Sequence, residues 1–325
     1  MSAARVQCQL CPWECVLSPG QRGRCRARQN IGGELATLVY GNPCAVNIDP
    51  MEKKPLFHFH PATTIFSIAT AGCNFSCSFC QNWQISQSAP EDVRGHSLSP
   101  RQVVEEAIRA GCRSIAYTYN EPVIFFEYAY DCAALAREKG IRNVLVTNGF
   151  INEEPLRRLC RVLDAANVDL KGDDDYYRRI CGGRLAPVER TIEVMKEEGV
   201  WVEITNLVVP TLNDRAEDFR RLSQWVRRKA GADTPLFFSR FTPMYRLQKL
   251  PLTPTSTLQQ ARGIAREEGL NYVYTGNIRG VESESTFCPD CGKMIIKRIG
   301  YGVPEMRIKE GGCAFCGRPI AGVWS

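Results

Sequence analysis

The sequence lacks any long apolar run, and none approaches the roughly 18 residues that a membrane-spanning helix needs. Its first residues also lack a hydrophobic signal region, so we expect a protein that is not exported and that stays in the cytoplasm. Positive charge is in only modest excess, with a net charge of +6. This excess allows an anionic partner without requiring one. The interleaved basic and aromatic residues typical of RNA-binding sheets are absent, which argues against nucleic acid as a partner.

Cysteine, by contrast, is abundant. Sixteen cysteines in a chain without an export signal predict metal or redox chemistry rather than a disulfide framework. Most of them form three groups: Cys8, Cys11, Cys15 and Cys25; Cys73, Cys77 and Cys80; and Cys288, Cys291, Cys313 and Cys316. The others are isolated, and we expect Cys112, Cys132 and Cys160 to be small buried hydrophobic residues.

The middle of the chain alternates predicted strands with predicted helices. The strands are expected at residues 64–69, 114–118, 143–147, 167–170, 201–209, 236–241 and 272–274. The helices are expected at 100–110, 122–139, 152–163, 187–198, 214–230 and 255–268. This order predicts right-handed βαβ units and a parallel sheet. We therefore predict an α/β fold, a partial (β/α)6-type TIM barrel, with an open doubly wound sheet as the alternative.

The predicted barrel covers residues 63–280 and is flanked by two small cysteine-rich segments. Residues 1–62 form a predicted N-terminal metal-binding segment, and residues 281–325 form a predicted C-terminal segment resembling a zinc ribbon. The C-terminal segment is too short to bury a large core, so a bound metal is expected to stabilise it.

The most informative motif is the cysteine triplet at Cys73, Cys77 and Cys80, which directly follows the first predicted barrel strand. Three thiolates can hold three corners of a [4Fe–4S] cube, which normally has four cysteine ligands. The fourth iron would then be open to a substrate or cofactor. A zinc knuckle is the alternative, but no further cysteine or histidine occurs nearby before His96, and structural zinc sites have four ligands.

Polar residues recur near the ends of the later strands. Candidate ligand-binding residues among them are Asn120, Glu121, Asn148, Asp169, Lys171, Asn206 and Arg240. Turn and cap chemistry accounts for any one of them alone. Because the carboxyl ends of barrel strands meet at one mouth, the set predicts a ring around a pocket beside the triplet.

The triplet, with the aromatic Phe79 before its last cysteine, resembles the radical S-adenosylmethionine (SAM) superfamily. The resemblance implies that SAM binds the open iron and that an electron from a flavodoxin-type or ferredoxin-type donor cleaves it. The resulting 5′-deoxyadenosyl radical would abstract hydrogen from a substrate. By the same resemblance, Asn120 and Glu121 occupy the segment that contacts the SAM amino group. Asp169 and Lys171 match an Asp-x-Lys pair of pyruvate formate-lyase activating enzymes.

A closer resemblance extends over most of the chain. The segments around Cys8–Cys25, Asp49–Phe59, Ala71–Ser86 and Tyr117–Pro122 are similar to the radical SAM proteins of the AmmeMemoRadiSam system, which are relatives of those activating enzymes. This implies Memo-like and AMMECR-like proteins as partners. Two other functions stay open, namely an activase that installs a glycyl radical on a protein and a non-catalytic metal protein that binds nucleic acid.

The two outer cysteine groups differ in spacing. Cys288, Cys291, Cys313 and Cys316 form two C-x2-C-Gly knuckles, which predict a tetrahedral four-thiolate zinc site, with rubredoxin-like iron as the rival. The N-terminal C-x2-C-x3-C-x9-C group fits either zinc or an auxiliary [4Fe–4S] cluster. We favour zinc there because the segment is rich in glycine and arginine and lies near the terminus.

Overall fold

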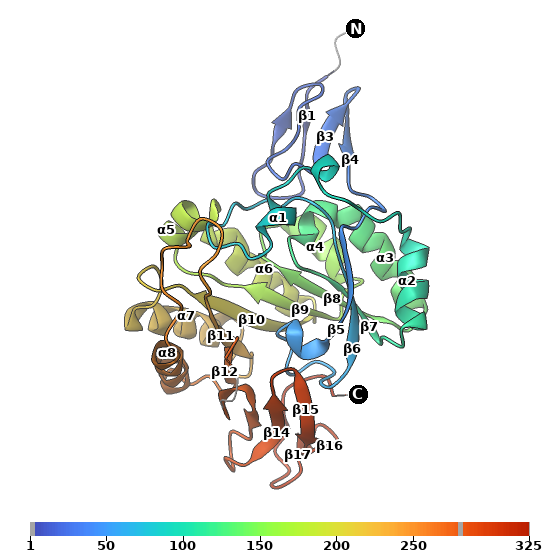
Figure 1. Cartoon of the computed structure of the whole chain (residues 1–325). Coiled ribbons are helices and arrows are strands. Elements are labelled where there is room, and N and C mark those ends of the chain that lie inside the picture. The colour runs from blue at the N-terminus through green and yellow to red at the C-terminus, as the bar shows by residue number, and fades with distance from the viewer. Residues whose placement is uncertain (1–3, 279–281, 325) are drawn as a thin grey trace.

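The computed structural model describes residues 4–278 and 282–324. Figure 1 shows a small N-terminal β lobe at the top, a central α/β unit, and a C-terminal β unit at the bottom. The predicted boundary between residues 280 and 281 lies outside the described residues. No helix of the described part is long and apolar enough to cross a membrane.

An eight-stranded sheet forms the central unit. Its strands, in sequence order, are β5 (Ala45–Pro50), β6 (Thr64–Ala69), β7 (Ser114–Tyr117), β8 (Arg142–Thr147), β9 (Ala165–Asp169), β10 (Trp201–Val208), β11 (Leu236–Arg240) and β12 (Val273–Gly276). Spatial order follows sequence order, and β6 to β12 are all parallel, whereas β5 pairs antiparallel with β6 at one edge. All seven predicted strands are observed. The uninterrupted order excludes the doubly wound alternative, which needs a reversal of strand order. The finer description as a partial barrel stays a prediction.

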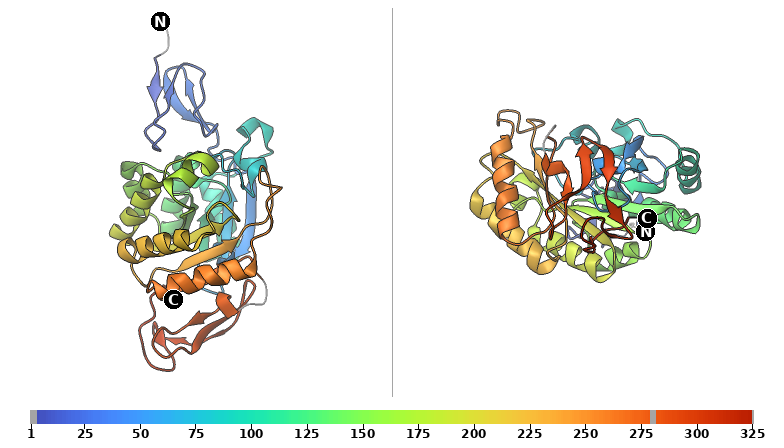
Figure 2. Two further views of the ribbon diagram at one scale, coloured as in Figure 1. Left: turned by 90° about the vertical axis from the view of Figure 1, so that its left-hand side faces the viewer. Right: turned by 90° about the horizontal axis from the view of Figure 1, so that it is seen from below.

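The main helices lie on one side of this sheet (Figure 2). They are α2 (Pro100–Arg109), α3 (Phe126–Glu138), α4 (Glu153–Cys160), α6 (Leu185–Glu197), α7 (Ala216–Lys229) and α8 (Thr255–Glu267). Each coincides with a predicted helical segment, and Ser99 caps α2 through a capping box with Gln102. Cys112, Cys132 and Cys160 are buried in the core, as predicted.

The N-terminal lobe consists of two short hairpins. They pair β1 (Val6–Gln7) with β2 (Val16–Leu17) and β3 (Arg28–Ile31) with β4 (Glu34–Thr37). The stretch at residues 35–40 has the pattern of a strand, and β4 covers only its first part. The loop between β1 and β2 carries Cys8, Cys11 and Cys15.

The C-terminal unit has a three-stranded antiparallel sheet and a small hairpin. The sheet contains β13 (Thr286–Phe287), β14 (Met294–Ile299) and β15 (Gly302–Met306), and the hairpin pairs β16 (Ile308–Lys309) with β17 (Gly312–Cys313).

A buried polar network joins this C-terminal unit to the central sheet. The Glu203 carboxylate accepts hydrogen bonds from the backbone N–H groups of Phe57 (2.9 Å) and His58 (2.8 Å). Arg298, from β14, donates to the Phe57 carbonyl at 2.7 Å. The His58 ring lies 2.6 Å from the carbonyl oxygen of Ala321. Burial raises the pKa of Glu203 to about 7, although its hydrogen-bond donors oppose this shift.

Candidate functional site

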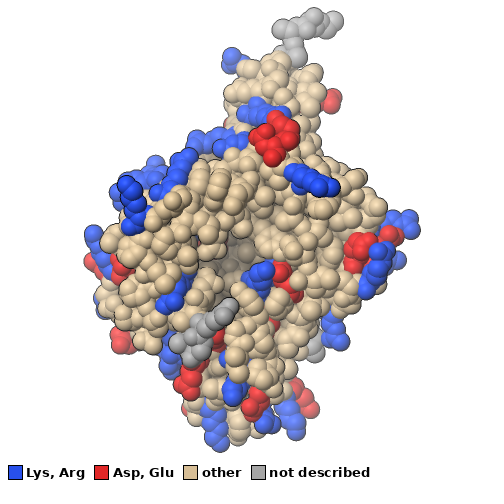
Figure 3. Space-filling model, in the orientation of Figure 1, with Lys and Arg blue, Asp and Glu red and all other residues tan. Residues whose placement is uncertain are grey.

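A cavity of about 350 Å³ opens at the carboxyl ends of the parallel strands. Figure 3 shows the hollow in the middle of the molecule. All three cysteines of the triplet contribute to its lining. Of the other predicted ligand-binding residues, it contains Asn120, Asn148, Asp169 and Lys171. The fold thus brings together residues from four separate strand ends.

The triplet lies in the loop between β6 and α1 (Trp83–Ser86). The backbone N–H of Phe75 donates to the Cys73 sulfur at 3.4 Å, the Asn148 amide lies 3.9 Å from the same sulfur, and Cys80 pairs with Ser86 Oγ at 3.1 Å. Such donors stabilise thiolates. Among the described residues, the three sulfurs do not gather within 4.8 Å of one another, as ligands of one metal ion would. They therefore fit ligation of separate irons of a cluster that faces the cavity.

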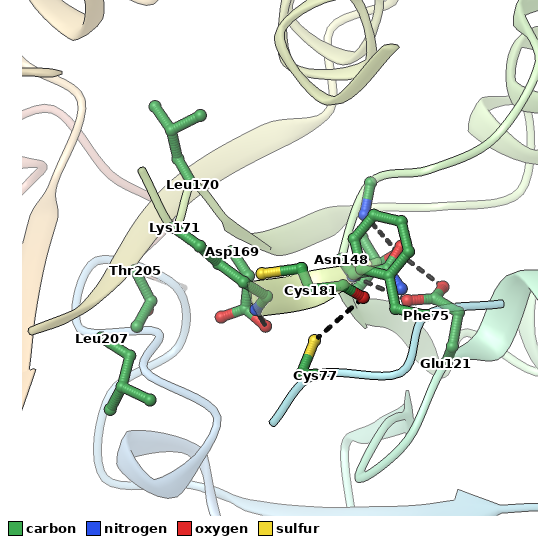
Figure 4. Close-up of polar contacts among 12 residues, drawn as sticks. Phe75, Cys77, Glu121, Asn148, Asp169, Leu170, Lys171, Cys181, Thr205 and Leu207 are labelled. Atoms are coloured by element: carbon green, nitrogen blue, oxygen red, sulfur yellow. Dashed lines mark hydrogen bonds and ion pairs between the residues drawn. The ribbon is translucent and has the colours of Figure 1, made fainter. Parts of the chain in front are cut away.

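A buried ion pair lies beside the second cysteine. Lys171 Nζ is 2.5 Å from Asp169 Oδ2, and Lys171 is buried (Figure 4). Burial opposes the charge on Lys171, but Asp169 and the nearby thiols of Cys77 and Cys181 raise the pKa of Lys171 above its ordinary value. Cys77 Sγ is 4.0 Å from the carbonyl oxygen of Cys181. Lys171 thus stays protonated beside the thiols, paired with Asp169, and its ammonium group can donate to an anionic cluster or a carboxylate.

Cys181 is one of the isolated cysteines, and no sequence pattern predicts a helix or strand at its position. It ends a π-helical turn, Tyr177–Cys181, which follows the short helix α5 (Asp174–Tyr176), and its side chain is fully buried. Isolated π-helical turns are frequent at functional sites. Nothing in the spacing of Cys181 could have placed it beside the triplet.

Asn120 and Glu121 have different positions although they are adjacent. The Asn120 side chain lines the cavity and donates to the carbonyls of Thr70 and Gly72, the latter at 2.7 Å, so it fixes the chain just before the triplet. Glu121 is fully buried and is not part of the cavity lining. Its carboxylate accepts from Asn148 N at 2.7 Å, and also from Thr147 Oγ1 and Val123 N. Burial raises the pKa of Glu121 to about 7. Glu121 was expected in the segment that contacts the SAM amino group. For its carboxylate to bind that group, Glu121 would have to give up these hydrogen-bond partners.

Asn206 and Arg240 lie away from this cavity. On β10, Thr205 and Leu207 line it, and Asn206 between them points to the other face of the sheet, where it donates to Leu170 O at 2.8 Å. Arg240, the last residue of β11, donates to Thr255 Oγ1 at 2.5 Å at the start of α8. The structure does not bring either side chain to the triplet, because strand alternation turns both outward.

Several lining residues were not predicted from the sequence. Lys53 and Lys54 contact Asp49 at 2.8 and 2.6 Å, and Tyr119 Oη donates to the same carboxylate at 2.5 Å. Lys54 is almost fully buried, and burial lowers its pKa to about 8 despite the pairing with Asp49. Tyr301, on the turn between β14 and β15, adds a phenol from the C-terminal unit. The Asp49–Phe59 segment carries part of the family resemblance, but its side chains were not predicted to line the cavity.

The four C-terminal cysteines form a compact metal-binding group. All four sulfurs lie within 4.8 Å of one another, with Cys288 and Cys316 at 3.6 Å and Cys291 and Cys313 at 3.8 Å. Four thiolates around one zinc at about 2.3 Å would be about 3.8 Å apart, so the geometry fits one metal ion. The N-terminal cysteines also come together, since Cys8, Cys11, Cys15 and Cys25 line one small cavity. The choice of metal at either place stays a prediction.

Comparison with known proteins identifies the family. The sequence profile of the Radical SAM superfamily matches residues 67–224. The chain is 46% identical over 318 residues to the uncharacterized protein MJ0808 of Methanocaldococcus jannaschii, covering 97% of this chain and 95% of the relative. It is 24% identical over 222 residues to the pyruvate formate-lyase-activating enzyme of Clostridium pasteurianum, covering 65% of this chain and 81% of that enzyme.

A solved structure shows the same fold. A radical SAM methyltransferase from Sphaerobacter thermophilus superposes with a TM-score of 0.51 at 18% identity, over 73% of this chain and 71% of that one. Superfamily membership implies a [4Fe–4S] cluster and SAM, and the triplet beside the cavity fits both. The triplet, the α/β fold with a central parallel sheet and these matches together show one result. The chain belongs to the radical SAM superfamily.

Proposed function

We propose that this radical SAM enzyme forms a 5′-deoxyadenosyl radical that abstracts a hydrogen atom from a substrate held in the cavity. The observation that carries the proposal is the opening of all three triplet cysteines into a cavity lined by polar strand-end residues. When bound, the cluster and SAM supply the electron transfer and the radical. The chain supplies the cluster ligands, orients SAM and the substrate, and excludes water from the cavity.

Different residues of the cavity would bind the cluster, contact SAM and exclude water. Cys73, Cys77 and Cys80 would hold the cluster, with thiolate charge stabilised by the donors already described. Asn148 and the Asp169–Lys171 pair line the same cavity as the triplet, and they would contact the polar groups of SAM. Apolar side chains complete the lining and exclude water from the radical: Phe75, Phe79, Val146 and Leu207.

Another part of the lining suits the substrate. Lys53, Lys54 and Tyr119 present ammonium and phenol groups, and Lys53 is 44% exposed. These groups favour a substrate with an anionic or hydrogen-bond-accepting group.

The test is anaerobic SAM cleavage. The reconstituted protein is mixed with dithionite and SAM, and 5′-deoxyadenosine is measured by chromatography in wild type, Cys77→Ala and Cys44→Ala. Cys44 lies outside the three cysteine groups and is the matched control. We expect product from wild type and Cys44→Ala and none above background from Cys77→Ala. Equal product from Cys77→Ala would refute the proposal.

A second candidate function is activation of a glycyl radical protein. It is favoured by the similarity to the Clostridium pasteurianum activating enzyme over 65% of this chain. Transfer of deuterium from a glycine-deuterated partner protein into 5′-deoxyadenosine would support it, and transfer only from small molecules would oppose it. The same assay, with ferredoxin or flavodoxin replacing dithionite, tests the proposed electron donors. Addition of Memo-like and AMMECR-like proteins tests the proposed partners.

A further inference from the structure

The four N-terminal cysteines are spaced unlike the four C-terminal ones. Among residues 4–278 and 282–324, only the C-terminal cysteines bring three or more ligand atoms within 4.8 Å of one another. Cys8, Cys11, Cys15 and Cys25 nevertheless surround one cavity. The triplet of the superfamily cluster has the same wide arrangement. Thiolates that bind different irons of one cube lie farther apart than thiolates that share one ion, so the N-terminal spacing matches a cluster.

A buried cation borders this cavity. Arg28 is 5% exposed and contributes to the lining, and its Nη2 pairs with Glu127. Its Nε–H is buried and has no partner among the described residues. A buried donor without a partner is costly, and an acceptor inside the cavity would satisfy it. The sulfur atoms of a cluster are such acceptors.

The N-terminal group touches the loop of the catalytic triplet. The carbonyl oxygen of Cys25 is so close to Gly72 that an added Cβ on Gly72 would lie 2.4 Å from it. Gly72 directly precedes Cys73. The indole N–H of Trp13 donates to the carbonyl of Asn74 at 2.8 Å, on the other side of Cys73. The two cysteine groups are thus joined through backbone on both sides of a triplet ligand.

We propose that Cys8, Cys11, Cys15 and Cys25 bind a second [4Fe–4S] cluster, in place of the zinc that the sequence favoured. The contact between Cys25 and Gly72 gives this cluster a short path for one-electron exchange with the cluster held by Cys73. In that exchange one cluster loses an electron and the other gains it, and no bond or proton changes. The electron enters from a low-potential protein donor of the ferredoxin or flavodoxin class.

The first experiment removes the triplet and leaves the N-terminal group intact. The variant Cys73→Ala/Cys77→Ala/Cys80→Ala is reconstituted anaerobically, and iron, sulfide and zinc are measured together with Mössbauer and EPR spectra. We expect about four irons and four sulfides per chain, and an S = 1/2 signal after reduction. Further substitution of Cys11 and Cys25 by Ser should remove them, whereas Cys313→Ser should not. Zinc that is lost with Cys11 and Cys25, with no cluster iron, would overturn the proposal.

The second experiment tests the contact between the two sites. In fully reduced wild type, EPR should show spin–spin broadening that is absent from the triplet variant. Two independent, unbroadened signals would contradict the electron path. Neither readout depends on SAM cleavage, so failure here is distinguishable from failure of the proposed enzymatic function.

Discussion

The two outer cysteine groups each bring four thiols together, but they differ in geometry and surroundings. The C-terminal sulfurs are packed at 3.6 and 3.8 Å, and two of their cysteines are exposed. The N-terminal sulfurs are farther apart, around an internal cavity, and none of their cysteines is exposed. This difference in folded spacing, which the sequence spacing does not reveal, favours one metal ion at the C-terminal group and the proposed cluster at the N-terminal group.

The two groups also differ in how they attach to the enzyme. The N-terminal lobe contacts the triplet loop at the carboxyl ends of the strands, through Cys25, Gly72 and Trp13. The C-terminal unit is anchored by the buried network around Glu203 and Arg298. We therefore expect changes in the first attachment to alter the iron chemistry, and changes in the second to alter mainly stability.

The largest expected effect is loss of the C-terminal metal. Cys313→Ser removes one of four ligands, and structural zinc sites supply much of the folding energy of small units, so we expect a loss of about 5 kcal/mol or more in the local unfolding free energy. Hydrogen exchange over residues 286–313, together with zinc analysis, measures it. The iron content should stay unchanged. Unaltered exchange in Cys313→Ser would show that the metal does not stabilise this unit.

The next effect comes from Gly72→Ala. Its Cβ would meet the Cys25 carbonyl at 2.4 Å, and the backbone φ of +101° is itself unfavourable for alanine. We expect a loss of about 3 kcal/mol in unfolding free energy and displacement of the N-terminal lobe.

Gly231→Ala is the matched control for this substitution. Gly231 has nearly the same φ, +104°, but has nothing within 4 Å of an added Cβ. It should cost only about 1 kcal/mol, the backbone strain alone. Urea unfolding measures both variants, and EPR should change only in Gly72→Ala. Equal costs in the two variants would mean that the Cys25 contact is unimportant.

The unfolding free energy should depend on pH through Glu203, which belongs to the buried network that anchors the C-terminal unit. Glu203 has a pKa of about 7 in the folded protein against an ordinary value near 4.5. Between these values the folded state binds a proton that the unfolded state releases, so the unfolding free energy falls as pH rises, by about 3 kcal/mol in all. Glu203→Gln cannot titrate and should show a flatter profile. Urea unfolding at about pH 5 and about pH 7.5 measures the difference. Identical slopes in wild type and variant would exclude Glu203 as the source, and the exposed Glu305→Gln is the control.

The smallest expected effect compares two indole hydrogen bonds. Trp13→Phe removes the bond to Asn74 O (2.8 Å), and Trp324→Phe removes the bond to Ile320 O (2.9 Å). Each should cost about 1 kcal/mol, or roughly 2 °C in Tm, measured by thermal unfolding. Only Trp13→Phe should also alter the reduced EPR spectrum. A spectral change in both variants, or in neither, would remove the distinction between the two attachments.

Much of the central fold could be predicted from the sequence, because alternating strand and helix patterns are local. Strand β5 was missed, since it is an edge strand that ends at Pro50 and lies in a stretch without clear periodicity. The π-helical turn ending at Cys181 was missed because nothing in its sequence marks the widened turn.

The candidate site was predictable only in part, for a different reason. The triplet and the strand-end residues Asn148, Asp169 and Lys171 follow from short motifs and from strand order. Asn206 and Arg240 required knowledge of which face each strand residue occupies, and a shift of one residue reverses it. The contribution of Tyr301 depends on long-range docking, which no local pattern encodes.

Tyr301 also bears on the order in which the enzyme is completed during synthesis. Units near the N-terminus fold first as a chain emerges from the ribosome. The triplet loop can form early, but the lining of the cavity is completed only when Tyr301, which is far later in the chain, has been made and its unit has docked. A chain that stops before Tyr301 would therefore carry the triplet cysteines with the cavity lining incomplete. Docking of the C-terminal unit thus makes completion of the cavity a late step in synthesis.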